Sequence, residues 1–176
     1  MILKETKLKG AYFINLERKE DERGFFARSF CEKEFAAHNL NLSIRQSNIS
    51  YNKKRGILRG MHYQIAPHEE AKIVSCARGA IYDVIIDLRP RSLTYRQYLA
   101  VELNDQNYSS LYIPVGFAHG FQALADDTVV LYQMSEFYYP ESARGIRWND
   151  PLFAISWPIL PCIVSNKDAS YPDYEA

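Results

Sequence analysis

Long hydrophobic runs are missing from this chain of 176 residues. Although 47% of the residues are hydrophobic, no run reaches the roughly 18 residues that a transmembrane helix needs. The opening residues, MILKETKLKG, contain lysines with no apolar segment after them, so they do not resemble a secretory signal. We therefore expect a cytoplasmic protein with no membrane partner.

Cysteine is scarce, and charge of either sign has no excess. Cys31, Cys76 and Cys162 are widely spaced, odd in number and without a CxxC pair, which argues against a disulfide framework or a cysteine-based zinc site. The 21 basic and 21 acidic residues cancel. The composition therefore lacks the basic excess of a nucleic-acid-binding protein, and we expect reduced thiols and no nucleic-acid partner.

Several catalytic motifs are also absent. The sequence contains no P-loop, no dinucleotide-binding fingerprint and no G-x-S-x-G elbow. Many small β-barrels bind a metal through a His-x-His pair, but here His62 is followed by Gln64. The remaining histidines, which form no such pair either, are His38, His68 and His119. We expect no metal and no cofactor.

Aromatic residues are abundant, with 13 Tyr and 9 Phe, and they favour strands and clefts that bind rings. Short runs of alternating polarity are separated by turn residues, without linkers or repeats, which predicts a single all-β domain over 1–176, a sandwich or barrel. The expected strands are Ala11–Asn15, Gly24–Phe30, Ile44–Ser50, Gly56–Gln64, Ala71–Ala77, Ala80–Leu88, Gln97–Leu103, Ser110–Pro114, Gly120–Leu124 and Thr128–Met134.

One short helix and an irregular tail complete the expected fold. Ser29 and Glu32 have the spacing of a capping box, and Asn39 is a helix-ending residue. The tail after Asp150 is rich in proline, so we expect it to lie over the barrel surface. The packed side of the helix would be formed by Cys31, Phe35 and Ala36.

The segment GILRGMHYQ places a histidine on a strand. A period of two puts His62 on one face with Leu58, Gly60 and Gln64, and the opposite face then carries Arg59, Met61 and Tyr63. A histidine on a strand is more often a packed or surface residue than a proton-transfer group. The pattern leaves both interpretations of His62 open.

Three further residues have side chains suited to an active site, but the sequence pattern alone does not assign them that role. Lys72 lies among apolar residues, where it either extends to the barrel mouth or places positive charge beside an oxyanion. His119, between glycine and two phenylalanines, is either a structural histidine or a ligand contact. Tyr132 shares a strand face with Val130 and Met134, and that face points into a closed barrel or away from it.

A last group of residues suits a diphosphate with an attached base. The run from Asp21 to Phe26 sets Arg23 beside two aromatic rings, Gln46 and Asn48 offer amides on a strand, and Arg59 follows on the next strand. Guanidinium groups bind phosphate oxygens in pairs, while rings stack on bases. A surface cluster of ion pairs is the simpler alternative.

Seven segments together resemble the dTDP-4-dehydrorhamnose 3,5-epimerase family, from about Lys9 to Asp168 and in the expected order. They are DERGFF (21–26), QSN (46–48), GILRGMHYQ (56–64), EEAKIV (69–74), IYDVIIDLRP (81–90), LYIPVGFAHGF (111–121) and WNDPLFAISWP (148–158). This resemblance implies a metal-free cupin-type jelly-roll barrel that works as a homodimer on a nucleotide-linked 4-keto-6-deoxyhexose.

The resemblance also implies roles for individual residues. His62 matches the general base that epimerises C3 and C5 through an enolate, Asp168 its carboxylate partner, Tyr132 the general acid on the other face of the sugar, and Lys72 the group near the keto oxygen. The implied substrate contacts are Arg23, Phe25, Gln46, Asn48, Arg59, His119 and Tyr138. The N-terminal segment carrying Arg23 and Phe25 is typically donated by the partner subunit.

Two positions depart from the family pattern. Arg28 stands where a glutamate commonly contacts the nucleotide sugar, and Ala143 where another glutamate often follows Tyr-x-Pro-Glu-Ser. Arg28 is then either a substrate contact of reversed charge or a surface residue paired with an acid such as Glu32. These departures leave open an enzyme that inverts one centre or uses another nucleotide, and a catalytically silent binding protein. A metal-dependent cupin enzyme would need a bound metal to stay in consideration.

Overall fold

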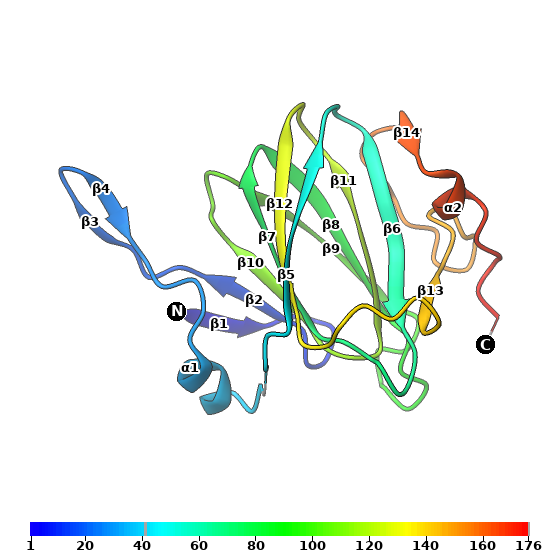
Figure 1. Ribbon diagram of the computed structural model, residues 1–176, viewed down its shortest axis with the longest axis horizontal. Coiled ribbons are helices and arrows are strands. Elements are labelled where there is room, and N and C mark those ends of the chain that lie inside the picture. Colours follow the sequence, from blue (N-terminus) through cyan, green and yellow to red (C-terminus); the bar gives the residue numbers. More distant parts are fainter. Residues whose placement is uncertain (41, 176) are drawn as a thin grey trace.

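The computed structural model describes residues 1–40 and 42–175, and its body is built on two β-sheets that face each other (Figure 1). Within these ranges, no helix has the length and apolar character needed to cross a membrane. The first sheet, called the β5 sheet, has the order β1 (Ile2–Glu5), β2 (Tyr12–Asn15), β10 (Ser110–Ile113), β7 (Lys72–Arg78), β12 (Thr128–Met134) and β5 (Gln46–Asn52).

The second sheet, called the β6 sheet, faces it. Its order is β13 (Ala143–Gly145), β6 (Ile57–Gln64), β11 (Phe117–Ala123), β8 (Ala80–Asp87) and β9 (Tyr98–Asn104), with β14 (Ile163–Val164) parallel to β6. Between β5 and β13 the chain changes sheet at every connection except that from β8 to β9. Strands adjacent in space therefore come from distant parts of the sequence, as in jelly-roll folds.

The expected strands agree with the observed ones wherever the alternation is clear. Thr128–Met134 is β12 residue for residue, whereas β11 begins three residues before the expected Gly120. The expected strand Gly24–Phe30 ends at Phe26, because β4 (Gly24–Phe26) pairs only with the short β3 (Lys19–Asp21) in a two-stranded hairpin. Four short strands, β1, β3, β13 and β14, were not predicted, since two to four residues carry little alternation.

The helix was predicted in the right place with the wrong cap. Helix α1 (Glu32–Ala37) begins after Cys31, which makes no side-chain capping hydrogen bond, so the Ser29–Glu32 capping box does not form. Asn39, with a left-handed φ of 60°, does follow its end. The tail contains a second short helix, α2 (Asn166–Ala169), which the prediction of an irregular tail missed.

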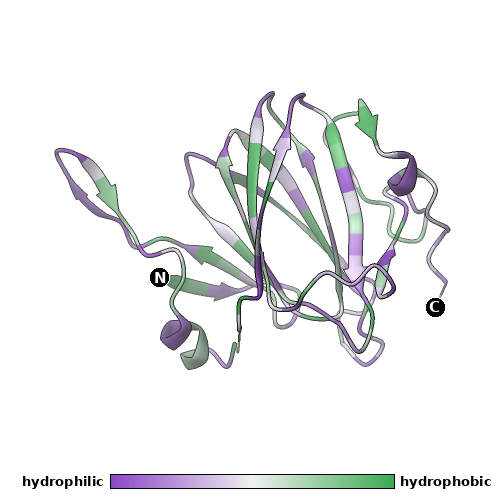
Figure 2. Ribbon diagram, viewed as in Figure 1, coloured by the Kyte–Doolittle hydropathy of each residue, from purple (hydrophilic) through white to green (hydrophobic). Residues whose placement is uncertain are grey.

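The space between the sheets changes from apolar to polar along the strands. Val74 and Cys76 on β7 and Val130 on β12 belong to a buried core that also includes residues of β8, β9, β10 and β11. Farther along the same inward faces stand Lys72 and Tyr132. Figure 2 shows the strands changing between hydrophobic and hydrophilic along their length. One part of the interior is thus a packed core, and the other is available for chemistry.

Two further apolar clusters cover the outer faces of the sheets. Phe35 of α1 packs with Ile73 and Tyr112 on the outside of the β5 sheet. On the outside of the β6 sheet, Phe153 and Trp157 of the tail pack on Val84 and Ala118. The tail therefore lies over the barrel surface, as expected, and its far end carries α2 back to β6.

Candidate active site

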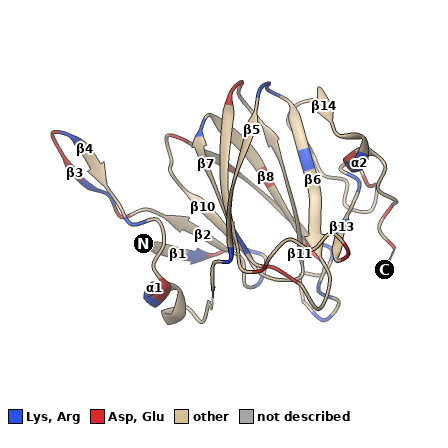
Figure 3. Cartoon of the chain, viewed as in Figure 1, with Lys and Arg blue, Asp and Glu red and all other residues tan. Residues whose placement is uncertain are grey.

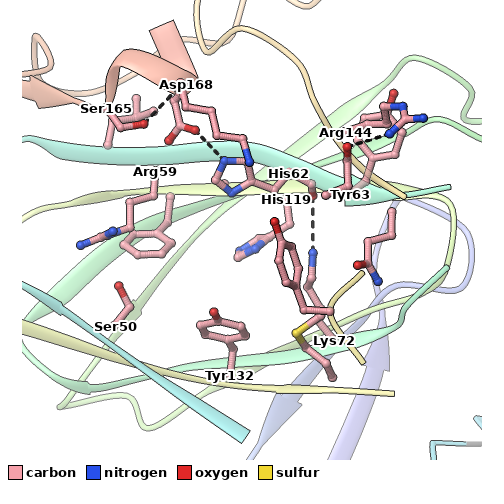
Figure 4. A pocket seen from close by; sticks show the side chains of 18 of the residues that line it. Ser50, Arg59, His62, Tyr63, Lys72, His119, Tyr132, Arg144, Ser165 and Asp168 are labelled. Carbon is pink, nitrogen blue, oxygen red and sulfur yellow. Dashed lines mark hydrogen bonds and ion pairs between the residues drawn. The ribbon is translucent and has the colours of Figure 1, made fainter. Parts of the chain in front are cut away.

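A cavity of about 690 Å³ opens between the two sheets. Its walls come from β5, β6, β7, β11, β12 and β13 and from the C-terminal tail (Figure 4). Seven of the residues predicted for the site line it: Arg59, His62, Lys72, His119, Tyr132, Tyr138 and Asp168. Asp168 reaches it from the tail. The fold thus brings together in one chamber residues that span more than half the sequence.

The strand face predicted for Arg59 is wrong, because β6 contains an irregularity. His62 pairs with His119 while Arg59 pairs with Phe121, so three steps on β6 match two on β11. This β-bulge shifts the alternation, and Arg59 and His62 face the same cavity instead of opposite faces. Gly60 stands inside the bulge at a φ of 128°, and a Cβ there would lie 2.5 Å from the Cα of Gly120. A strict period of two cannot anticipate such a shift.

His62 and Asp168 form a hydrogen-bonded pair. Nε2 of the imidazole lies 2.7 Å from Oδ1 of the carboxylate, whose other oxygen accepts from the Gly60 amide at 3.2 Å. The Asp168 side chain is only 6% exposed and His62 is 45% exposed. Burial alone raises the pKa of Asp168, but the hydrogen bond from His62 and that from Gly60 hold this pKa below its ordinary value. An ionised Asp168 therefore orients an imidazole that is open to the cavity.

Tyr132 faces this imidazole from the opposite sheet. Figure 4 shows His62 entering the cavity from β6 and Tyr132 from β12, with space between the two side chains. Burial raises the pKa of the Tyr132 phenol, an effect that Arg59 partly opposes. The phenol keeps its proton at neutral pH, so the cavity holds a proton donor across from a basic imidazole.

Lys72 on β7 adds a positive charge to the cavity wall, where it pairs in register with Met134 on β12. Its ammonium lies 2.7 Å from Oε1 of Glu70 and 3.4 Å from the backbone oxygen of His62. Both side chains are almost fully buried, with 8% of Lys72 and 4% of Glu70 exposed. A fixed, buried ammonium is suited to stabilising an oxyanion.

His119 is the second histidine of the cavity, and it also has a carboxylate partner. Its Nε2 lies 2.7 Å from Oδ1 of Asp83 on the neighbouring strand β8, and the pair is buried. This arrangement fixes the orientation of the imidazole in the wall. Sequence reasoning found His119 but not Asp83, whose inward direction depends on the register between β8 and β11.

The two amides expected to contact the substrate, Gln46 and Asn48, both lie on β5. Gln46 accepts a hydrogen bond from the backbone N–H of Tyr138 at 2.6 Å, and Asn48 lies 3.6 Å from the Met134 sulfur. Neither amide is among the residues that line the cavity, although Tyr138 and Met134 are. Arg59 donates to Asn52 at 2.8 Å, and it is the one arginine of β6, visible as the blue band of that strand in Figure 3.

The predicted N-terminal contacts lie away from this chain's own cavity. Arg23 and Phe25 belong to the β3–β4 hairpin, which projects from the body with charged residues on its length (Figures 1 and 3). Arg23 is 85% exposed and pairs with Asp21. Arg28 pairs with Glu34 at 3.2 Å rather than with Glu32, so the expected kind of ion pair forms with a different acid. None of these three predicted substrate contacts reaches the cavity from within the described chain.

The cavity contains further functional groups that sequence reasoning missed. Tyr171 of the tail packs edge-on against His62, with ring centroids 6.1 Å apart and planes at 71°. Gly145, which pairs with His62 across β13 and β6, leaves room for that ring, because a Cβ there would overlap it. Ser50, Glu70 and Arg144 also line the cavity. Only the segment EEAK, which names Glu70 beside Lys72, carried a signal for any of them.

The arrangement supports proton transfer on a ring. A base held by a carboxylate, a phenol across from it and a buried ammonium can remove a proton, stabilise the anion and return a proton on the other side. In residues 1–40 and 42–175, no group of three His, Cys, Asp or Glu residues is placed to hold a metal ion.

Comparison with known proteins identifies the family of this chain. The family model described as dTDP-4-dehydrorhamnose 3,5-epimerase matches residues 5–176. The dTDP-4-dehydrorhamnose 3,5-epimerase of Methanothermobacter thermautotrophicus is 42% identical over 170 residues, covering 95% of this chain and 91% of the relative. A crystal structure of that enzyme from Elizabethkingia anophelis superposes with a TM-score of 0.96 at 40% identity, over 99% of this chain and 96% of the other.

A third comparison includes a bound sugar nucleotide. The epimerase of Legionella pneumophila, crystallised with dTDP-4-keto-L-rhamnose, has a TM-score of 0.90 and 34% identity over 99% of both chains. The fold is that of a cupin-type jelly roll, and the protein is an isomerase. The chain belongs to the dTDP-4-dehydrorhamnose 3,5-epimerase family. Its resemblance in sequence to this family is thereby confirmed.

Proposed function

We propose that this protein inverts C3 and C5 of a dTDP-linked 4-keto-6-deoxyhexose, and that His62, Tyr132, Lys72 and Asp168 carry the reaction. Family membership supports the reaction, as does the sugar nucleotide in the Legionella pneumophila relative. The single observation that carries the assignment to these residues is that His62 and Tyr132 line one cavity from opposite sheets.

His62 begins the reaction. A ketone at C4 acidifies the hydrogens on C3 and C5, so a neutral imidazole takes one of them as a proton, and the electron pair of the broken C–H bond moves into an enolate with its charge on O4. Histidine is a common general base in enzymes that work near neutral pH. Asp168, kept ionised, fixes the imidazole tautomer and stabilises the imidazolium.

Tyr132 and Lys72 complete each inversion. The phenol donates its proton to the same carbon from the face opposite His62, which reverses the configuration and returns the ketone. The ammonium of Lys72 stabilises the negative charge on O4, an interaction of a kind worth about 3 kcal/mol or more. The resulting tyrosinate and imidazolium then exchange protons with solvent, and the cycle repeats at the second carbon.

A second copy of the chain would complete the site. The β3–β4 hairpin extends away from its own barrel and presents Arg23 together with Phe25 and Phe26, which are 39% and 71% exposed. A basic group beside exposed rings suits the diphosphate and base of a substrate held by a partner. We therefore propose that the protein is a homodimer in which the hairpin of each subunit enters the partner's cavity.

Simpler observations support proposals for the cellular location and the domain organisation. The three cysteines, all in the described part of the chain, are free thiols, as in reducing compartments. We therefore propose that the protein works in the cytoplasm. We also propose that residues 1–176 act as one domain, because the tail supplies both the outer cover of the β6 sheet and Asp168 of the site.

Isotope exchange tests the proposed reaction. Wild-type protein incubated in heavy water with dTDP-4-keto-6-deoxyglucose should give product that carries deuterium at both C3 and C5 by NMR. Label at neither carbon would overturn the proposal. Label at one carbon only would replace it with a single-centre epimerase, the alternative that Arg28 and Ala143 raise, and the same experiment with CDP- and GDP-linked sugars checks the nucleotide.

Complementation tests the dimer. Arg23→Ala and His62→Ala should each be nearly inactive, yet an unfolded and refolded equal mixture should recover about one quarter of wild-type activity, because half of the dimers are mixed and each mixed dimer has one intact site. If Arg23 served its own chain, a mixed dimer would contain no intact site and the mixture would stay inactive.

A further inference from the structure

The buried carboxylate of Glu70 has one oxygen that no described side chain or backbone group satisfies. Its Oε1 pairs with the Lys72 ammonium at 2.7 Å, while Oε2 is buried without a hydrogen-bond partner among the described residues. The Glu70 side chain is only 4% exposed, and the residue lines the cavity. This unpaired acceptor thus belongs to a side chain that lines the chamber in which the sugar is expected to bind.

The chemistry of this oxygen restricts what it can bind. A buried ionised oxygen is costly unless a donor reaches it, because it has lost its hydration. The diphosphate carries no donor and would be repelled by the carboxylate, and a ketone oxygen carries no hydrogen. A hydroxyl group of the sugar supplies the donor that Oε2 needs.

The position of Lys72 selects the hydroxyl. If its ammonium meets O4, as the proposed function requires, the carboxylate that holds the ammonium lies beside the atoms attached next to C4. Those are the hydroxyl on C3 and, beyond C5, a methyl group that cannot form a hydrogen bond. Vicinal oxygens on a pyranose lie close together, as do an ammonium and the carboxylate that it bonds.

We propose that Glu70 is a specificity-determining residue that accepts, through Oε2, a hydrogen bond from the sugar hydroxyl vicinal to the ketone. This proposal rests on the proposed function. The Glu70–Lys72 pair then recognises a hydroxyketone at two points, because the ammonium binds the ketone oxygen and the carboxylate binds the neighbouring hydroxyl. Sugars that lack this hydroxyl leave the buried oxygen unpaired and bind poorly.

A substrate comparison tests the proposal. Exchange at C5 is measured for dTDP-4-keto-6-deoxyglucose and for its 3-deoxy analogue, because C5 is common to both. Wild type should prefer the hydroxylated sugar by about 10- to 100-fold in kcat/KM, the range of a hydrogen bond to a charged group. Glu70→Ala should lower that preference to within about threefold. Glu70→Met, which retains the length of the side chain, provides the same test if the smaller residue impairs folding.

Matched controls separate this role from a structural one. Glu69→Ala changes the exposed neighbouring acid and should keep the full preference of wild type. Two results would overturn the proposal: a Glu70 variant that retains the preference, or one that slows both sugars equally, which would limit Glu70 to positioning Lys72. If wild type exchanged neither sugar, the proposed reaction would fail, while the ratio of the two dissociation constants by calorimetry would still test Glu70.

Discussion

His62 on β6 and Asp168 on α2 share a 2.7 Å hydrogen bond although 106 residues separate them in the sequence. Helix α2 has only four residues, and Ser165 caps it by accepting from the Asp168 amide at 3.0 Å. The tail that holds this helix is anchored by Phe153 and Trp157 on the outside of the β6 sheet. The packing of the tail thus controls the orientation of the proposed base.

Removing the Asp168 charge should therefore slow the reaction without unfolding the protein. In Asp168→Asn, the amide no longer stabilises the imidazolium, and we expect kcat to fall by about 100-fold or more, within the range of general-base contributions. The rate of C5 deuterium exchange measures the loss. Asp173→Asn, which changes an exposed carboxylate of the same tail, should retain near wild-type activity. Equal losses in the two variants would mean that only tail packing matters.

Gly145 and Tyr171 should be coupled energetically. An alanine at 145 overlaps the Tyr171 ring, so Gly145→Ala should destabilise the fold by about 1–3 kcal/mol, as overpacked sites do. In the double variant with Tyr171→Ala, the ring is gone and the added methyl group should cost much less. Urea denaturation of the four proteins gives the coupling, and additive effects of the two substitutions would contradict it.

Acid should destabilise the fold through Asp87 at the end of β8. Burial raises the pKa of this carboxyl, but hydrogen bonds from Arg89, Ser92 and Thr94 prevail and lower it from 3.8 to about 2. Because the pKa is lowered in the folded state, the ionised Asp87 stabilises the protein above about pH 4, by about 2 kcal/mol. This stabilisation is lost as the pH falls toward 2.

The test of Asp87 is a comparison of stability curves. Urea denaturation of wild type should show a fall in unfolding free energy between pH 4 and pH 2 that is steeper than in Asp87→Asn, which has no carboxyl to titrate. The variant should also be less stable at neutral pH, because an uncharged amide bonds the Arg89 guanidinium more weakly. Parallel curves for the two proteins would contradict the assignment.

Alternation of side chains predicted most of the long strands, because each has one face inside the barrel. It grouped Tyr132 with Val130 and Met134 on one face but left the direction of that face open, and the structure points it inward. It misplaced Arg59, since the bulge at Gly60 adds a residue to β6 that nothing in the local pattern marks. Short paired segments such as β13 and β14 depend on tertiary contacts rather than on their own sequence.

The site was less accessible to local reasoning than the fold. Pattern alone left His62, Lys72 and His119 as ambiguous residues, and the family resemblance, rather than periodicity, singled out Asp168. Tyr171 and Asp83 were missed because their contacts with His62 and His119 join strands and tail across long stretches of sequence. The placement of Arg23 depends on a second chain, which no local pattern describes.

Opposed proton transfer by His62 and Tyr132 is the central claim, and Tyr132→Phe tests it most directly. The variant retains the base and the ammonium, so His62 can still remove a proton and return a solvent deuteron to the same face, whereas the other face has lost its donor. Tyr82→Phe, which changes a phenol on the outside of the β6 sheet, should behave as wild type.

The measurement is the stereochemistry of the labelled sugar by NMR after incubation in heavy water. We expect Tyr132→Phe to incorporate deuterium at C3 or C5 with retained configuration, while product with inverted configuration forms at least about 100 times more slowly than in wild type. Inversion at an undiminished rate in this variant would contradict the claim, because the second proton would then come from a group other than Tyr132.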